Sequence, residues 1–306
     1  MNQKTNIQDI TKEISDLESR LQDAKARLAA ANGPKEKHDP WPHMQNGYLE
    51  KGKDILSTPI HALLLLSDSA LPLGSFAYSN GLESFLAHNK PLTRSITPLA
   101  SFRRFLKLSI ASIASTSLPY ILAAYRHPEQ LETLDNDMDA STPCIVAQRA
   151  SVAQGRALLS VWERSFRWTY ASKSDDGITA TACKSLDAFS DGIKSTIGTA
   201  DDIGPKGHFP VLWGVVCLVM GVDIQQVAYI FMVNHAKAVL SAAVRASVMG
   251  PYQAQSFLAS KELQDMIMER IDREWDTDVT DAGQVVPPLD LWVGRHELLY
   301  SRIFNS

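Results

Sequence analysis

The sequence predicts an all-α protein: a single compact helical domain preceded by an N-terminal extension. Nearly every patterned segment after residue 57 repeats its apolar residues at the three- and four-residue spacing of a helix. No segment shows convincing alternation of apolar and polar residues between turn signals, which is the pattern of a half-buried strand. Apolar residues make up 45% of the 306 residues, so the chain can bury a sizeable core.

The N-terminal extension comprises residues 1–57. It begins with a seam of about three heptads, which is typical of a marginal coiled coil or of a helix awaiting a partner. Residues 32–54 are rich in proline, glycine and charged side chains and predict a flexible linker. The helical domain is therefore expected to span residues 58–306. The heptad seam consists of Ile7, Ile10, Ile14, Leu17, Leu21, Ala24 and Leu28.

Capping and proline signals bound the first long helices of the domain. Thr97 is a predicted N-cap, because Pro98 follows it at the first helical position. The pattern Ser117-x-Pro119 predicts that a second helix starts there and ends before residue 127. We therefore expect two consecutive helices in this part of the chain.

The middle of the domain changes from polar to apolar and back. Residues 127–143 are acidic and polar and predict a loop, whereas residues 144–170 carry the apolar spacing of one long helix. Residues 172–206 are polar and contain glycines, so we expect a polar insertion around a short helix.

The last third of the domain contains the most apolar segment. "HFPVLWGVVCLVMGV" has almost no polar residue and predicts a central core helix that Gly221 ends. Asp223 is a predicted N-cap of the next helix, which should run to Gly250-Pro251. One further amphipathic helix is expected over residues 253–274, followed by a C-terminal tail, residues 275–306.

Charge and cysteine content narrow the classes of partner. The formal net charge is −4 and charged residues make up 21%, which predicts neither a nucleic-acid footprint nor a polybasic membrane patch. The three cysteines are far apart and form no disulfide framework or metal pair. The N-terminus lacks an apolar signal region, and the longest apolar run is too short to cross a bilayer comfortably. We expect a cytoplasmic protein.

Motifs for catalysis and metal binding are missing from the sequence. It contains no HExxH, GxSxG, P-loop or GxGxxG pattern. The eight histidines are scattered singly, so no metal site can be built locally. His235 predicts a hydrogen-bonded core histidine, and His296-Glu297 predicts either an acid–base pair or a surface hydrogen bond. We expect no catalytic, cofactor-binding or metal-binding residue.

The stretch "ALPLGSFAYSNGLES", residues 70–84, is too apolar for a free loop and too interrupted for a helix. Pro72 fixes φ and Gly74 permits unusual backbone. Ser79 is placed to cap a helix that begins near residue 82, and Glu83 falls in the favourable first turn of that helix. The stretch is therefore predicted to be a rigid, partly apolar loop, which serves either as a buried turn or as a docking surface.

Four blocks in order give the sequence a family resemblance. "LLLLSDSALPLGSFAYSNGLESFL" resembles the N-terminal signature of the urease accessory protein F (UreF) family. "QRASVAQGRALL", "GHFPVLWGVVCLVMGVD" and the final "RHELLYSRIFNS" are similar to three further blocks of that family. Ser75 and Tyr78 depart from the family pattern, where glycine and histidine are common, and Tyr78 leaves no histidine to act there.

The resemblance implies an all-helical homodimer that catalyses no reaction. Such proteins bridge a nickel- and GTP-binding GTPase to a second urease accessory protein of the UreD/UreH type, which docks on apo-urease, with nickel only in transit. It also implies that Arg302 anchors the tail near Phe76 when the partner binds; a tail docked permanently on its own domain is equally open. Arg156 is expected to have a structural role rather than a GTPase contact. The implied partner-binding residues are Pro72, Gly74, Ser75, Phe76, Tyr78, Ser79, Glu83, Arg156, His296, Glu297, Tyr300 and Arg302.

Two other functions remain open on the sequence. One is an all-α hydrolase that uses Ser75 or Ser79 as a nucleophile with a distant histidine as base. The other is a coiled-coil adaptor unrelated to nickel, which binds its partner through residues 7–28.

Overall fold

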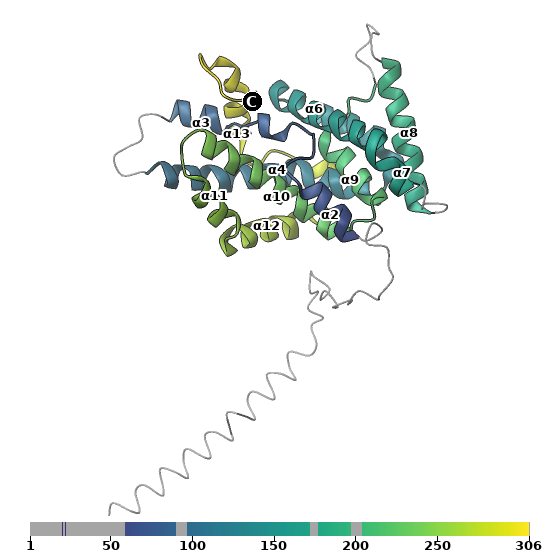
Figure 1. The fold of residues 1–306 in the computed structure, drawn as a ribbon, viewed down its shortest axis with the longest axis horizontal. Helices are drawn as coiled ribbons and strands as arrows, with labels where there is room; N and C mark the ends of the chain where they lie inside the picture. Colours follow the sequence, from purple (N-terminus) through teal and green to yellow (C-terminus); the bar gives the residue numbers. More distant parts are fainter. Residues whose placement is uncertain are drawn as a thin grey trace, which may run out of the picture. The chain divides into compact units, whose positions relative to one another are not determined.

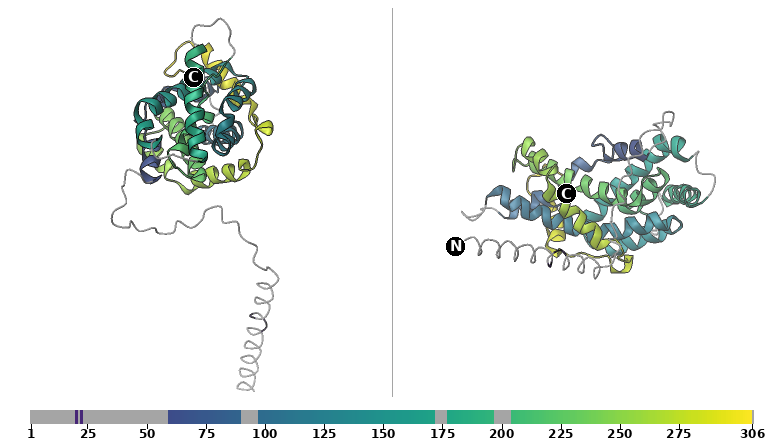
Figure 2. Two further views of the ribbon diagram at one scale, coloured as in Figure 1. Left: turned by 90° about the vertical axis from the view of Figure 1, so that its right-hand side faces the viewer. Right: turned by 90° about the horizontal axis from the view of Figure 1, so that it is seen from below.

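The computed structural model describes residues 59–89, 97–171, 177–196 and 204–305, together with Arg20 and Gln22. Within these ranges the chain forms helices joined by turns, with no strand, so the all-α prediction is confirmed (Figure 1 and Figure 2). The heptad seam and the predicted linker lie outside the described residues.

The described helices follow one another with mostly short connections. A π-helical segment, Trp162–Phe166, continues α6, and 3-10 turns cover Ser75–Ala77, Pro128–Gln130, Val279–Asp281 and His296–Leu298. The α-helices are α2 (Pro59–Ser67), α3 (Leu82–His88), α4 (Pro98–Arg126), α5 (Leu131–Ser141), α6 (Ile145–Val161), α7 (Arg167–Tyr170), α8 (Ile178–Thr196), α9 (Phe209–Val219), α10 (Ile224–Arg245), α11 (Pro251–Leu258), α12 (Lys261–Glu274) and α13 (Pro287–Arg295).

Helix α9 is the centre of the hydrophobic core. It is apolar on every side, and each residue from Pro210 to Val219 is buried. Helices α4, α6 and α8 pack around it (Figure 1). Gly221 has a φ of 74°, and the amide of Val222 donates to the Cys217 carbonyl at 3.1 Å, which ends the helix. The predicted core helix and its stop signal are confirmed.

Helix α4 runs without a break through Pro119, where the sequence predicts a new helix. A proline at this position lacks the N–H that would bond to the Ser115 carbonyl, four residues earlier. That carbonyl instead accepts the N–H of Gly283 at 3.2 Å. The prediction of two helices is therefore wrong, because the C-terminal segment replaces the missing hydrogen bond. The predicted N-cap is confirmed: the Thr97 hydroxyl accepts the N–H of Ala100 at 3.1 Å.

Helices α4 and α10 are long and apolar enough to cross a membrane by length and composition alone. Both helices are longer than residues 209–222, the longest apolar run expected from the sequence. However, 78% of the apolar window of α4 and 56% of that of α10 is buried inside the protein. Helix α4 packs against α9, α10 and α12. Apolar helices covered by neighbouring helices are typical of a core, so these two helices are weak evidence for a membrane span.

Residues 127–143, predicted as a polar loop, are mostly helical. Helix α5 buries Leu134 and Met138, which lie four residues apart on one face. Asp135 is also fully buried, and its carboxylate accepts the backbone N–H groups of residues 206–208 at 2.6 to 3.1 Å. The loop prediction is wrong. The acidic composition of the segment predicts exposed side chains, but backbone N–H groups from a distant segment donate to the Asp135 carboxylate and allow it to be buried.

The region predicted as a polar insertion contains α8, a helix of 19 residues rather than a short one. One face of α8 packs against α9 and forms part of the wall of the core. Residues 172–176 and 197–203 lie outside the described residues. The buried residues of α8 are Ala182, Leu186, Phe189, Ser190 and Ile193.

The single amphipathic helix predicted over residues 253–274 is two helices, α11 and α12. The break falls at Ser260, whose hydroxyl donates to the Phe257 carbonyl at 2.7 Å and accepts the Leu263 N–H at 3.2 Å. Ser260 is thus the N-cap of α12.

Helix α6 crosses the segment before α9 at close range. A Cβ atom added to Gly155 would lie 2.1 Å from the carbonyl oxygen of Gly207, so only glycine fits at this crossing. The next residue, Arg156, donates from Nε to the Lys206 carbonyl at 2.7 Å. The QGR block therefore joins α6 to the segment that leads into the core helix.

The substitution Gly155→Ala should lower the free energy of unfolding by about 2 kcal/mol or more, because overpacking against backbone forces the two segments apart. Urea denaturation measures this change. Gly283→Ala is the matched control, since a Cβ there meets nothing within 4 Å, and it should change stability by less than about 0.5 kcal/mol. A Gly155→Ala variant as stable as the control would contradict the close crossing.

Candidate functional site

The loop of residues 68–81 joins α2 to α3 and holds a defined backbone. Gly74 and Gly81, with φ of 72° and 84°, take the left-handed conformation that favours glycine. Asn80 between them also has a positive φ, 52°. Helix α3 begins directly after Gly81, where the sequence places it. The structure thus agrees with the predicted loop before a helix, and its role in docking stays a prediction.

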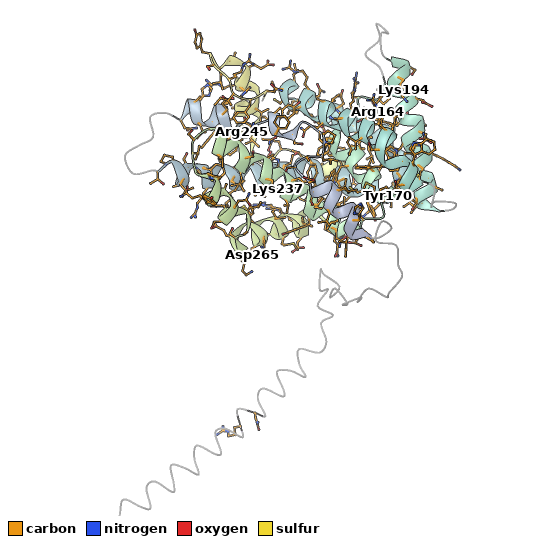
Figure 3. All side chains as sticks on the ribbon, in the orientation of Figure 1. Arg164, Tyr170, Lys194, Lys237, Arg245 and Asp265 are labelled. Atoms are coloured by element: carbon orange, nitrogen blue, oxygen red, sulfur yellow. The ribbon has the colours of Figure 1, made fainter. Side chains whose placement is uncertain are left out.

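Helix α10 holds the start of this loop. The Asn234 amide donates to the Leu66 carbonyl at 3.0 Å, and the Lys237 ammonium donates to the Ser67 carbonyl. These carbonyls belong to the last turn of α2, where donors and cations are stabilising. Figure 3 shows Lys237 on the same helix as Arg245, which contacts a later part of the loop.

Helix α6 holds the loop from another direction. The Ser75 hydroxyl donates to the Gln154 side-chain oxygen at 2.8 Å, so the residue that departs from the family pattern gains a partner in the QGR block. Ser79 is fully buried, and its Oγ accepts the N–H of Glu83 in the first turn of α3 at 3.3 Å, although the N-cap residue of this helix is Gly81. Both serines therefore help to hold the loop and the first turn of α3 in place.

Glu83, in the first turn of α3, joins the loop to the C-terminal tail. Its carboxylate accepts the His296 Nε2–H group at 2.8 Å and the backbone N–H groups of residues 303 and 304 at 2.7 and 3.2 Å. His296 is fully buried, whereas its neighbour Glu297 is exposed and pairs with Arg149. His296 and Glu297 thus have different partners, so the acid–base pair is wrong and His296 does not form a surface hydrogen bond.

The tail lies on its own domain beside the loop. The Phe304 ring is buried, and the Arg245 guanidinium stacks over it at 4.4 Å from the ring centroid. The same guanidinium donates to the Phe76 carbonyl. The Asn305 N–H donates to the Ala77 carbonyl at 2.8 Å. Arg245 and the last residues of the tail therefore hold the loop between them.

Arg302, the predicted anchor of the tail, is exposed. Among the described residues the structure gives it no hydrogen bond or ion pair. In the single chain, Arg245 and Asn305 make the contacts between the tail and the loop, so the role of Arg302 on partner binding stays a prediction. The structure therefore shows the docked form of the tail, and Arg302 is left available on the surface.

Exposed apolar side chains lie on both the loop and the tail. We call Phe76, Leu298, Tyr300 and Ile303 the loop–tail surface; 68% of Phe76 and all of Tyr300 are exposed. Large apolar side chains that a folded backbone presents to solvent are typical of interaction surfaces. Of the predicted partner-binding residues, Phe76 and Tyr300 belong to this surface, whereas Ser79 and His296 are fully buried beneath it. Glu297 pairs with Arg149 of α6, and Arg156 contacts the segment before α9.

Sequence reasoning missed the residues that hold the two segments together. Arg245, Gln154 and Phe304 lie in predicted helices or in the family-like blocks, but no motif there indicates that they hold the loop or the tail. A signal was present for α10: Asn234, Lys237, Ser241 and Arg245 recur at intervals of three and four, which is a polar stripe on an otherwise apolar helix.

Two neighbouring cavities of about 190 and 180 Å³ lie beneath the loop. Both are lined by Asn80, Gln154 and His235. His235 Nε2 lies 2.8 Å from the Ser109 hydroxyl, which confirms the hydrogen-bonded core histidine. In the described part of the chain, no three His, Cys, Asp or Glu side chains gather closely enough to hold a metal ion.

The fold and the site define an all-α protein with exposed apolar side chains on the loop and on the tail beside it. Comparison with known proteins gives the family: the UreF family model matches residues 96–261. The chain belongs to the UreF family of urease accessory proteins.

The relatives cover nearly all of the helical domain. A protein of Schizosaccharomyces pombe called an uncharacterized urease accessory protein UreF-like is 36% identical over 249 residues, which are 81% of this chain and 98% of that protein. Urease accessory protein F of Arabidopsis thaliana is 28% identical, over 79% of this chain and 90% of its own length. Urease accessory protein UreF of Actinobacillus pleuropneumoniae is 24% identical, over 80% of this chain and 98% of that protein.

The half-buried imidazole of His235 predicts a specific acid sensitivity. Burial lowers the pKa of His235 from 6.5 to about 4, so the folded protein favours the neutral ring. Below pH 6.5 the unfolded chain binds a proton at His235, whereas the folded chain binds it only below about pH 4. The free energy of unfolding therefore decreases by about 2–3 kcal/mol as the pH falls from about 6.5 to about 4. Urea denaturation at pH 7 and pH 4.5 should show a smaller loss for His235→Gln than for the wild type. Equal losses would contradict the assignment.

Proposed function

We propose that this urease accessory protein is a non-catalytic scaffold that bridges a nickel- and GTP-binding GTPase and a second urease accessory protein during nickel insertion into apo-urease. The observation that carries the proposal is the loop–tail surface. Phe76 and Tyr300 are exposed apolar anchors, and the backbone beneath them is fixed by α10, α6 and Glu83. Family membership supplies the urease context.

The physical reason for assigning docking to this surface is preorganisation. A contact made by residues that are already held in place loses little conformational entropy on binding. Aromatic side chains such as Phe76 and Tyr300 are the residues that most often anchor an interface. We assign the loop–tail surface to the second accessory protein of the UreD/UreH type.

Nickel, in this proposal, crosses the assembly and has no resident site on this chain. The proposal draws on the scattered histidines and on the described residues, where no three side chains could together hold a metal ion. We further propose that the chain acts as a homodimer in the cytoplasm, in line with its three widely separated cysteines, whose number and spacing provide no disulfide framework.

The scaffold predicts a complex of defined mass. Purified chain, mixed with the GTPase and the second accessory protein in the presence of GTP and nickel, should co-elute as a species with two copies of each, measured by light scattering. Phe76→Ala combined with Tyr300→Ala should weaken this complex at least about 30-fold, as loss of central anchors does. Tyr252→Ala on α11 is the control, because Tyr252 is equally aromatic and 90% exposed outside the loop–tail surface. Separate elution of the wild-type chain from folded partners would overturn the proposal.

Deletion of residues 1–50 separates the scaffold from the coiled-coil adaptor. The helical domain carries the loop–tail surface and the described contacts that hold it, so the truncated chain should enter the complex with unchanged affinity. An adaptor that binds through residues 7–28 would lose its partner completely. The measurement is the same co-elution, with circular dichroism to verify that the truncated chain is folded.

A further inference from the structure

The carboxylate of Glu83 joins the start of α3 to the last residues of the tail by three hydrogen bonds. Its Oε1 accepts the Ile303 N–H at 2.7 Å, and its Oε2 accepts the Phe304 N–H at 3.2 Å and the His296 Nε2–H group at 2.8 Å. The Glu83 side chain is only 12% exposed and that of His296 is fully buried. A buried carboxylate is stable only when donors surround it, and here all three donors come from the last eleven residues.

The end of the tail, residues 299–305, has few attachments of its own. Residues 299–305 form no helix, and residues 300–303 are exposed. Beyond Glu83, the described contacts that fasten this segment to the loop and α10 are the Asn305–Ala77 hydrogen bond and the stacking of Arg245 on Phe304. We call residues 299–305 the strap. Its path therefore depends on one carboxylate more than on any other group.

Glu83 also decides which side chains the strap presents. Because the N–H groups of Ile303 and Phe304 both point to this carboxylate, the backbone is fixed with the Phe304 side chain buried. Ile303, one residue earlier, is then directed outward and is 64% exposed. Tyr300 is fully exposed on the same segment. The orientation of two members of the loop–tail surface thus follows from the two hydrogen bonds.

We propose that Glu83 is a positioning residue: its carboxylate clasps the strap beside the loop, and the second accessory protein binds the strap in this clasped form. The inference rests on the proposed function, and it adds a role that is distinct from direct contact with the partner. If the clasp opens, only the fraction of molecules with an ordered strap is ready to bind. The apparent dissociation constant rises by the inverse of that fraction.

The clasp is tested first without any partner. In Glu83→Gln one acceptor oxygen becomes an NH₂ group that faces N–H donors, so the strap should open more often. Hydrogen exchange of a C-terminal peptide that contains residues 299–305 should be at least tenfold faster in Glu83→Gln than in the wild type. Glu262→Gln is the matched control, because Glu262 lies in the first turn of α12 as Glu83 does in α3, but is exposed. Equal exchange in Glu83→Gln and the wild type overturns the clasp.

The positioning role is tested by affinity for the second accessory protein, measured by titration calorimetry. Glu83→Gln should bind at least tenfold more weakly than the wild type and Glu262→Gln. Phe304→Ala opens the strap without altering Glu83, and it should weaken binding similarly. The double variant should lose little more than either single one, because both act through the strap.

The possible results separate the two proposals. Faster exchange with unchanged affinity overturns the positioning role and leaves the scaffold intact. No binding by the wild-type chain overturns the scaffold and, with it, the positioning role, while the exchange data still decide whether the clasp exists. If Glu83→Gln fails to show a cooperative thermal transition, Phe304→Ala carries the test: accelerated exchange and weaker binding support the role, and unchanged affinity overturns it.

Discussion

Helix α9 imposes the constraint on which the rest of the domain depends. A helix that is apolar on all sides has to be covered on all sides, and α4, α6 and α8 do so. Two glycines make the close approach possible: a Cβ on Gly155 would meet the Gly207 carbonyl at 2.1 Å, and one on Gly214 would meet the Ile121 carbonyl at 2.5 Å. The core is therefore set by backbone contact at two crossings as well as by apolar burial.

Residues 206–208, which lead into α9, bury backbone N–H groups and a histidine that need hydrogen-bond partners. Asp135 of α5 receives three consecutive N–H groups of residues 206–208, and His208 lies within hydrogen-bond distance of Asp139 and Ser151 through its two ring nitrogens. Unpaired N–H groups at this depth would each cost about 1–3 kcal/mol. One buried network thus fixes α5 and α6 against the start of α9, and α6 in turn offers Gln154 to the loop.

At the surface of the domain, a few polar side chains also join segments that are distant in the sequence. Helix α10 is apolar where it faces the core, and its polar stripe fastens α2, the loop and the tail. Glu83 gives the tail its path, and the tail in turn gives α4 the hydrogen bond that Pro119 cannot make, through Gly283. Segments distant in sequence therefore stabilise one another, and the apolar side chains left outside are the ones available to a partner.

The sequence by itself determined the all-α class, the core helix and its glycine stop, the Thr97 cap and the loop before α3, because periodicity, caps and left-handed glycines act within a few residues. Its family motifs also marked the loop and the tail as the two halves of the site. Only the tertiary structure decided that α4 continues through Pro119, that the acidic segment holding Asp135 is helical, and that Arg245 and Asn305 hold the tail beside the loop. Each of these depends on a donor or acceptor many residues away, and local spacing carries no information about which distant group will be its partner.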